Sequence, residues 1–267
     1  MRFPRMLDVQ AAAPVSEAMS GRKKGTLRVG SSGYQYDHWK GVFYPEELAR
    51  DGWLGYYAKR FDTVEINNTY YGLPEARTFD AWREAVGPGF RYTLKFSRYG
   101  SHMKKLKDPA GTIGTFLERA EHLEAKLDAI LVQLPPHWRA APGRLAAFLA
   151  EAPTRHRWAV EFRDADWLRE EVYAVLREHA AAMVIHDLIA EHPRVLAADW
   201  VYLRFHGPAA SGDARYRYDY PPQALSAEAR RIKDHLAAGP DVYAYFNNDA
   251  EGCAIANALD LRRYVLS

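Results

Sequence analysis

The chain has 267 residues, of which 48% are hydrophobic and 26% are charged, a balance that excludes a largely disordered or collagen-like protein. The 36 basic and 34 acidic side chains leave a net charge of +2, too small to indicate nucleic-acid binding by itself. A single cysteine, Cys253, excludes an internal disulfide and a zinc site built from several thiolates. With one cysteine, we expect a reducing, cytoplasmic setting. No apolar stretch reaches the length of about 18 residues needed to span a membrane, so we expect no membrane contact.

Residues 1–26 differ in composition from the rest of the chain. A secretory signal needs a continuous apolar core of about 7–15 residues, and Pro4, Asp8 and Pro14 interrupt any such core here. A short basic run follows at residues 21–25 (GRKKG). We predict that residues 1–26 form a mobile extension and that residues 27–267 form one domain.

From residue 27 onward, short apolar or alternating runs recur, and each is followed by a turn signal. We predict strands at residues 27–30, 63–66, 92–96, 129–133, 158–162, 183–186, 201–206 and 242–246. Helical periodicity between these runs predicts helices at residues 76–86, 112–126, 144–150, 168–179, 226–238 and 254–264. Strands that alternate with helices indicate βαβ units and a parallel sheet.

The number and length of these units favour a single-domain (β/α)8 TIM barrel, an α/β fold. Eight units of about 30 residues each match the usual size of this barrel, about 250 residues. A doubly wound open sheet is the alternative, and it usually carries a glycine fingerprint at the first βα turn. Here that turn reads GSSGY at residues 30–34, without a GxGxxG pattern. We predict no bound cofactor.

Polar residues interrupt most of the predicted strands near their carboxyl ends, although a strand buried on both faces usually reads as a continuous apolar run. The interrupting residues are Glu65, Lys95, Gln133, Glu161, His186, Arg204 and His206. Residues two apart share a face, so Asn67 joins Glu65 and Arg163 joins Glu161. In a barrel these side chains converge on the mouth where active sites are built, and their charges should pair because isolated buried charges are costly. An ion-pair network that only fills the barrel is the alternative, but confinement of the polarity to one end favours a site.

Several motifs carry a resemblance to a known family. They are VGSSGY at residues 29–34, WKGVFYP at 39–45, VEINNTYY at 64–71, LVQLPP at 131–136, VEFR at 160–163, YFNND at 245–249 and ANA at 256–258. Over about residues 27–265 the chain resembles the domain-of-unknown-function 72 family of bacteria and archaea. The resemblance implies a TIM barrel but no established activity, so the function must be inferred from the site.

Two loops on the predicted mouth indicate an anionic, ring-bearing ligand. Residues 98–107 (RYGSHMKKLK) form a basic run, and residues 207–223 form a long turn-rich segment with RYRYDY at 215–220. Loops longer than about 12–15 residues are often lids or binding loops, and interleaved Arg and Tyr can neutralise phosphates and stack on rings. A solvated charge run and an unstructured insertion are the alternative.

The eighth βα turn, residues 247–252, leads into the last predicted helix. TIM barrels often bind phosphate at the loops after strands seven and eight with helix N-terminal amides. We therefore expect ligand contacts from Asn247, Asn248 and Gly252, although Asn248 can serve simply as the helix N-cap. Tyr34 in the first βα turn is a further expected contact.

These observations predict an enzyme that acts by general acid/base chemistry on a phosphorylated or otherwise anionic small molecule, such as a sugar phosphate or nucleotide. Glu161 is the first candidate for acid/base work, Glu65 is the second, and His206 is expected to move a proton. The predicted substrate-binding residues are Lys95, Arg163, Arg204, Asn67, Asn247, Asn248, Gly252 and Tyr34.

Other functions remain open on this pattern. One is a non-catalytic barrel that binds nucleic acid through the basic loop and the Arg–Tyr segment. Another is a metal-dependent isomerase or endonuclease-like barrel, with ligands drawn from Glu65, Glu161, His186, Asp187 and His206. Against a metal stand the strand-end cations and the absence of HxH or HExxH spacing, so we predict no metal. Glycoside hydrolysis would need two carboxyl groups about 5–9.5 Å apart.

Overall fold

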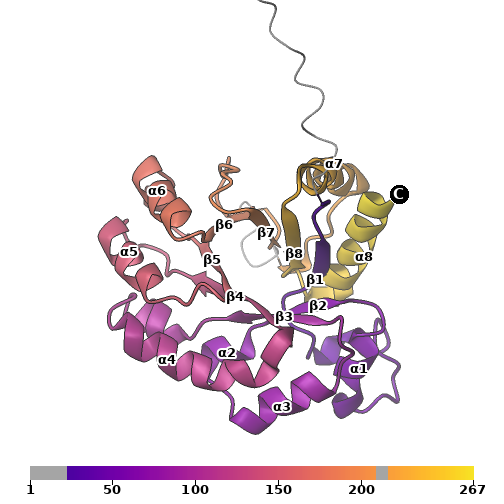
Figure 1. Ribbon diagram of the computed structural model, residues 1–267. Coiled ribbons are helices and arrows are strands. Elements are labelled where there is room, and N and C mark those ends of the chain that lie inside the picture. Colours follow the sequence, from indigo (N-terminus) through magenta and orange to yellow (C-terminus); the bar gives the residue numbers. More distant parts are fainter. Residues whose placement is uncertain (1–22, 209–215) are drawn as a thin grey trace, which may run out of the picture.

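The computed structural model describes residues 23–208 and 216–267. It contains eight strands: β1 (Leu27–Ser31), β2 (Thr63–Ile66), β3 (Arg91–Lys95), β4 (Leu127–Gln133), β5 (Arg157–Glu161), β6 (Ala182–His186), β7 (Trp200–Phe205) and β8 (Asp241–Phe246). They pair in parallel in the order β1-β8-β7-β6-β5-β4-β3-β2, as one nearly closed barrel with helices outside it (Figure 1). The predicted (β/α)8 TIM barrel is confirmed. Residues 1–22, most of the predicted extension, and residues 209–215 of the long loop lie outside the described part.

Six helices overlap the predicted segments, and α1 and α2 are short helices that were not predicted. They are α1 (Trp53–Tyr57), α2 (Asn68–Tyr71), α3 (Ala76–Glu84), α4 (Pro109–Ala120), α5 (Pro142–Ala150), α6 (Glu170–Glu178), α7 (Pro222–Ala238) and α8 (Cys253–Leu266). Shorter turns are η1 (Asp37–Trp39), η2 (Arg50–Gly52), the π-helical η3 (Tyr99–Met103), η4 (Glu121–Lys126), η5 (Ala165–Trp167) and η7 (Ala250–Gly252). No described helix has the length and apolar character required to cross a membrane.

The two largest differences from the predicted helix boundaries have identifiable reasons. Helix α7 begins at Pro222, four residues before the predicted start, because a proline at the first helical position already has a helical φ and needs no N–H partner. The helix predicted over residues 112–126 ends at Ala120. It continues as the turn η4, in which Glu124 has a φ of 52° that an α-helix does not accommodate.

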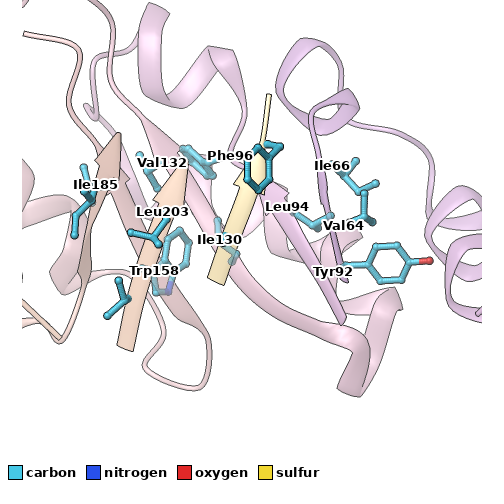
Figure 2. Packing of buried hydrophobic residues seen from close by; sticks show 14 of the residues in the cluster. Val64, Ile66, Tyr92, Leu94, Phe96, Ile130, Val132, Trp158, Ile185 and Leu203 are labelled. Carbon is cyan, nitrogen blue, oxygen red and sulfur yellow. The ribbon is translucent and has the colours of Figure 1, made fainter. Parts of the chain in front are cut away.

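The main core lies between the strands and the surrounding helices (Figure 2). On β3, Tyr92 and Leu94 point outward, and both are fully buried. Phe96, immediately after β3, packs against Phe116 of α4 and Phe148 of α5 with ring centroids 5.1 and 5.4 Å apart. Because side chains alternate along a strand, this packing directs the intervening residues of β3 into the barrel.

Aromatic side chains fill much of the barrel interior. Trp200, Tyr202, Tyr243 and Tyr245 are each at most 2% exposed. The Tyr245 hydroxyl lies 2.7 Å from Thr63 Oγ1 and 2.8 Å from Thr93 Oγ1, so it joins β8 to β2 and β3 across the interior. This layer closes the barrel below the carboxyl ends of the strands and supports the polar side chains there.

The barrel closes between β1 and β2 with the help of a tyrosine. The Tyr57 hydroxyl accepts a hydrogen bond from Ser31 N at 2.9 Å and donates to Thr63 O at 3.1 Å, so it replaces a direct bond between the two strands. A single bridge joins Ser32 to Glu65 at the mouth. This closure brings the first and second strands together where the polar cluster begins.

Candidate functional site

Arg204 at the end of β7 lies between the two candidate carboxylates. Its Nη2 donates to Glu65 Oε1 of β2 at 2.7 Å, and its Nη1 donates to Glu161 Oε2 of β5. The side chains of all three residues are at most 1% exposed. The strand-end charges are therefore paired with one another, as the cost of burying isolated charges predicts.

Glu161 accepts hydrogen bonds from two guanidinium groups. Arg163 Nε donates to its Oε1, while Arg204 occupies Oε2. Burial alone would raise the pKa of Glu161, but Arg163 and Arg204, helped by the neighbouring His206, hold the pKa well below its usual range. Glu161 is therefore ionised at neutral pH and has no proton to give.

Glu65 is held by three donors. Its Oε1 accepts from Ser32 Oγ as well as from Arg204, and its Oε2 accepts from the Tyr202 hydroxyl at 2.5 Å. Burial is the main cause that raises the pKa of Tyr202 well above its usual value, and the charge of Glu65 is the second cause. This hydroxyl therefore keeps its proton. Ser32 and Tyr202 were not among the predicted site residues. Tyr202 is detectable from its position two residues before Arg204, which places both on one face of the strand.

His206 lies beside Glu161 as a neutral ring. Its Nδ1 is 3.1 Å from Asn247 Nδ2, and its Nε2 is 3.8 Å from Glu161 Oε1. Burial and the neighbouring Arg204 lower the pKa of His206 well below its usual value. The structure thus brings Glu161, His206 and Asn247 together, but the imidazole holds no extra proton at neutral pH.

A cavity of about 480 Å³ opens at the carboxyl ends of the strands, next to this cluster. Six of the predicted site residues line it: Tyr34, Asn67, Lys95, Arg163, Arg204 and Asn247. Gln133 and the tyrosines Tyr36, Tyr70, Tyr71 and Tyr216 complete much of its wall. These polar and aromatic linings come from loops and strand ends far apart in the sequence, which is the usual composition of a TIM-barrel active site.

Lys95 at the end of β3 is the cation without a carboxylate partner. Its side chain is buried, and its Nζ lies 4.2 Å from the ring centroid of Tyr70. Within the described residues, no carboxylate lies within salt-bridge distance of Nζ and no acceptor is hydrogen-bonded to it. Burial, followed by the charge of Arg204, lowers the pKa of Lys95 to about 7. Lys95 therefore gains or loses its proton near neutral pH.

The cluster carries an excess of positive charge. Lys95, Arg163 and Arg204 contribute three positive charges and Glu65 and Glu161 two negative charges, so +1 remains in this cluster when Lys95 is protonated, while Asp249 adds a carboxyl group to the cavity wall. Arg163 Nη2 donates to the side chain of Gln133 at 3.1 Å, and Nη1 has no bonded acceptor in the described part of the chain. An unused donor of Arg163 and the amine of Lys95 thus meet at the cavity.

Asn248 and Gly252 do not line this cavity. Asn248 is buried, and its Nδ2 donates to Tyr218 O at 2.7 Å and to Asn257 Oδ1 at 2.8 Å, so it fastens the loop after β7 to α8. Gly252 forms the turn before α8 with a φ of 78°, and a Cβ there would lie 2.8 Å from a Val42 methyl group. Both residues therefore have structural roles at the start of the last helix.

The other candidate metal ligands also have protein partners. His186 Nε2 is bonded to Phe162 O at 2.7 Å, and Asp187 accepts hydrogen bonds from His206 N and the Tyr220 hydroxyl. Across residues 23–208 and 216–267, no three His, Cys, Asp or Glu side chains are grouped so that they could hold a metal ion. The guanidinium of Arg204 fills the position between the two glutamates where a cation would bind.

Comparisons with known proteins agree with this architecture. Residues 28–266 match the family described as "Protein of unknown function DUF72". A DUF72 family protein of Thermotoga maritima has a similar structure, with a TM-score of 0.79 and 30% identity over 91% of this chain and 100% of that chain. A second, from Enterococcus faecalis, has a TM-score of 0.76 at 22% identity over 91% of this chain and 96% of that one.

Two curated relatives are similar in sequence. The UPF0759 protein YecE of Escherichia coli is 33% identical over 110 residues, so the match spans 40% of this chain and 40% of that relative. The UPF0759 protein YunF of Bacillus subtilis is 24% identical over 80% of this chain and 86% of that relative. The family match extends over nearly the whole barrel. The chain therefore belongs to the DUF72 family.

Proposed function

We propose that the cavity at the barrel mouth binds a phosphorylated or otherwise anionic small molecule and that the chain is an enzyme acting on it by acid/base chemistry. The observation that carries this proposal is the buried side chain of Lys95, which lines the cavity and has no carboxylate partner among the described residues. Beside it, Arg163 offers a donor that no described residue uses. An anion held by such groups makes charge-assisted hydrogen bonds, which are stronger than neutral ones.

The size and walls of the cavity fit a compound such as a sugar phosphate or nucleotide. Its volume of about 480 Å³ lies within the usual range for small-molecule sites, about 300–1,000 Å³. The carbonyl oxygen of the Asn67 side chain is buried without a hydrogen-bond partner, so it is available to a ligand hydroxyl or N–H group. The tyrosines of the wall offer faces for a ring.

Within this proposal, Lys95 takes the acid/base role that the sequence pattern suggested for Glu161 and Glu65. A general base works best when its pKa is close to the working pH, and that of Lys95 is about 7. Glu161 and Glu65 instead hold Arg163 and Arg204 in place through their paired oxygens. His206 is neutral and hydrogen-bonded to Asn247, and it holds the part of the cluster next to Glu161 in position.

The response of the melting temperature to anions tests the proposal. Phosphate or a sugar phosphate at low millimolar concentration and fixed ionic strength is expected to raise the melting temperature, because it binds only the folded state. Arg163→Gln and Lys95→Gln should each reduce that rise. Arg230→Gln, an exposed arginine on α7, is the matched control and should keep it. Equal responses from wild type, Arg163→Gln and Lys95→Gln would place any bound anion elsewhere.

A second candidate function is the binding of single-stranded nucleic acid, favoured by exposed rings beside the basic run. Tyr71 and Tyr99 are 76% and 51% exposed, and Lys104 Nζ lies 5.4 Å from the Tyr99 ring centroid. Bases stack on such rings while lysines neutralise the backbone. Fluorescence anisotropy of a labelled oligonucleotide should then show binding that weakens with salt and with Tyr99→Ala. No binding at low salt would refute this candidate.

We also propose a cytoplasmic location. Cys253 is a free thiol that is partly exposed. Free thiols persist in reducing compartments, whereas extracellular cysteines are commonly oxidised. Recovery of the protein in the cytosolic fraction of its host cell is the expected result.

A further inference from the structure

We propose that Lys95 is a nucleophile that forms a Schiff base with the carbonyl carbon of an anionic aldehyde or ketone bound in the cavity. This inference rests on the proposed anion-binding function and deepens it, because it names the substrate class as a carbonyl compound that carries a carboxylate or phosphate. It also assigns Lys95 a covalent role in place of simple charge neutralisation.

The first support is the freedom of the amine. Even a partly buried lysine can satisfy its donors, as Lys126 does by donating to the carbonyl oxygens of Arg83 and Val86. Lys95 has no such partner among the described residues, although it is more deeply buried than most lysines in proteins. The amine of Lys95 contacts the face of the Tyr70 ring, which offers no atom to accept a directed hydrogen bond. The amine is therefore left available at the cavity wall.

The second support is the set of charges around the amine. The charged or titratable side chains that face Lys95 are Arg204 of β7, Glu161 and Arg163 at the end of β5, Glu65 of β2, Tyr70 of α2 and His102 of η3. The oxygens of both carboxylates accept hydrogen bonds from Arg204, Arg163 and other donors. Neither carboxylate therefore forms a salt bridge with the Lys95 ammonium. Burial and Arg204 favour the neutral amine, and the pKa falls to about 7.

The third support is a place for the anionic part of the substrate. Arg163 and Lys95 line the same cavity, and the Nη1 of Arg163 faces no acceptor in the described part of the chain. A carboxylate or phosphate bound to Arg163 would hold a small substrate in the cavity that Lys95 also lines. Holding the two reacting groups in one cavity supplies the orientation that a bimolecular imine reaction in water lacks.

The reaction is balanced without a further reactant. The neutral amine donates its lone pair to the carbonyl carbon, a C–N bond forms, and the carbonyl π pair moves to oxygen, which takes one amine proton. The C–O bond of this carbinolamine then breaks, and the oxygen leaves as water with the second amine proton. Amine and carbonyl thus give imine and water, with no change in oxidation state.

Reductive trapping of the full-length protein with glyoxylate tests the inference. Sodium cyanoborohydride transfers hydride to the imine carbon and leaves a stable carboxymethyl group on the lysine, which peptide mass spectrometry locates. At pH 7 about half of Lys95 is neutral, whereas a lysine of ordinary pKa is neutral in about one molecule in 2,500. We expect Lys95 to be labelled at least about tenfold faster than Lys107, which is exposed on the same side of the barrel.

Two controls separate this inference from the proposed function. Acetaldehyde, a neutral carbonyl compound, should label Lys95 more slowly than glyoxylate, and Arg163→Gln should lower the glyoxylate rate by a larger factor than the acetaldehyde rate, which falls only with the neutral fraction of the amine. Lys95→Met, checked for folding by circular dichroism, should lose the site-specific label. The comparison of Lys95 with Lys107 in the wild-type chain needs no variant, so it remains decisive if a variant fails to fold.

The possible outcomes distinguish the Schiff-base inference from the proposed anion site. Equal labelling of Lys95 and Lys107 would overturn the Schiff-base inference. If phosphate still raised the melting temperature in an Arg163-dependent way, the anion site would stand without it. If Lys95 reacted fast with both aldehydes and Arg163→Gln changed neither rate nor the phosphate response, the nucleophile would stand and the proposed anion site would fail.

Discussion

Replacement of Lys95 by methionine is expected to stabilise the protein at neutral and mildly acidic pH. Lys95 is 7% exposed. Its burial, together with the positive charge of Arg204, lowers its pKa from 10.5 to about 7. At about 1.4 kcal/mol per pKa unit, this change corresponds to about 5 kcal/mol of unfavourable free energy for the charged side chain in the folded state. Loss of the cation–π contact with Tyr70 offsets about 1–2 kcal/mol. The expected gain below pH 7 is therefore about 3 kcal/mol.

The sign of the pH dependence follows from proton binding. Between pH 7 and 10.5 the unfolded chain still holds the Lys95 proton while the folded chain has lost it, so wild-type stability rises with pH in this window. The advantage of Lys95→Met should be constant below pH 7 and shrink as pH rises toward 10.5. A methionine of similar length keeps the packing, which isolates the effect of the charge.

Urea unfolding of wild type and Lys95→Met at several pH values between about 6 and 9.5 measures this difference. Lys107→Met, at an exposed lysine, is the control and should change the stability by less than about 0.5 kcal/mol. The reasoning is refuted if Lys95→Met is less stable than wild type below pH 7. It is equally refuted if the difference between them does not change with pH.

Three further expectations concern the rest of the chain. Arg204→Met should destabilise the fold by about 3–5 kcal/mol in urea unfolding, because it leaves Glu65 and Glu161 buried without their shared partner; a loss below about 1 kcal/mol would contradict the central role of this arginine. Deletion of residues 1–24 should leave the melting temperature nearly unchanged, whereas a drop of several degrees would show that they dock on the barrel. Elemental analysis after dialysis should find no stoichiometric transition metal, and about one zinc, manganese or iron per chain would instead make Glu161 and His206 candidate ligands.

The strand pattern allowed the barrel to be predicted because it depends on local regularities. Each run of alternating or apolar residues became a strand within two residues of its expected bounds. The convergence of Lys95, Arg163 and Arg204 on one cavity followed from the rule that residues at the carboxyl ends of barrel strands meet at the mouth. Neither result required knowledge of contacts between particular side chains.

The roles of individual residues could not be predicted in the same way. Whether Glu161 acts as an acid or only holds arginines depends on which atoms its oxygens contact, and Arg163 and Arg204 reach it from two different strand ends. The sequence offers the same pattern in either case. Among the described residues, Lys95 differs from its neighbouring cations by the absence of a carboxylate partner, a property of three-dimensional packing that no spacing of residues encodes.

The tuning of Lys95 by its neighbours is open to direct measurement. Arg163 is among the charges that lower the pKa of Lys95, whereas Glu161 raises it. Arg163→Gln removes a positive charge and leaves Glu161 with one cationic partner fewer, so the pKa of Lys95 should rise above 7. The neutral fraction of the amine at pH 7 should fall accordingly.

Reductive methylation of the lysines with ¹³C-formaldehyde, followed by an NMR titration of the methyl signals, reports this pKa at Lys95. The signal is assigned by its absence in Lys95→Met, and the signal of exposed Lys107 is the internal reference. Arg230→Gln, on the far surface of α7, removes the same charge without touching the cavity and should leave the Lys95 midpoint unchanged. If Arg163→Gln also left it unchanged, burial alone would set the pKa. Arg163 would then serve only to hold the ligand, and the coupling between substrate anion and amine would be absent.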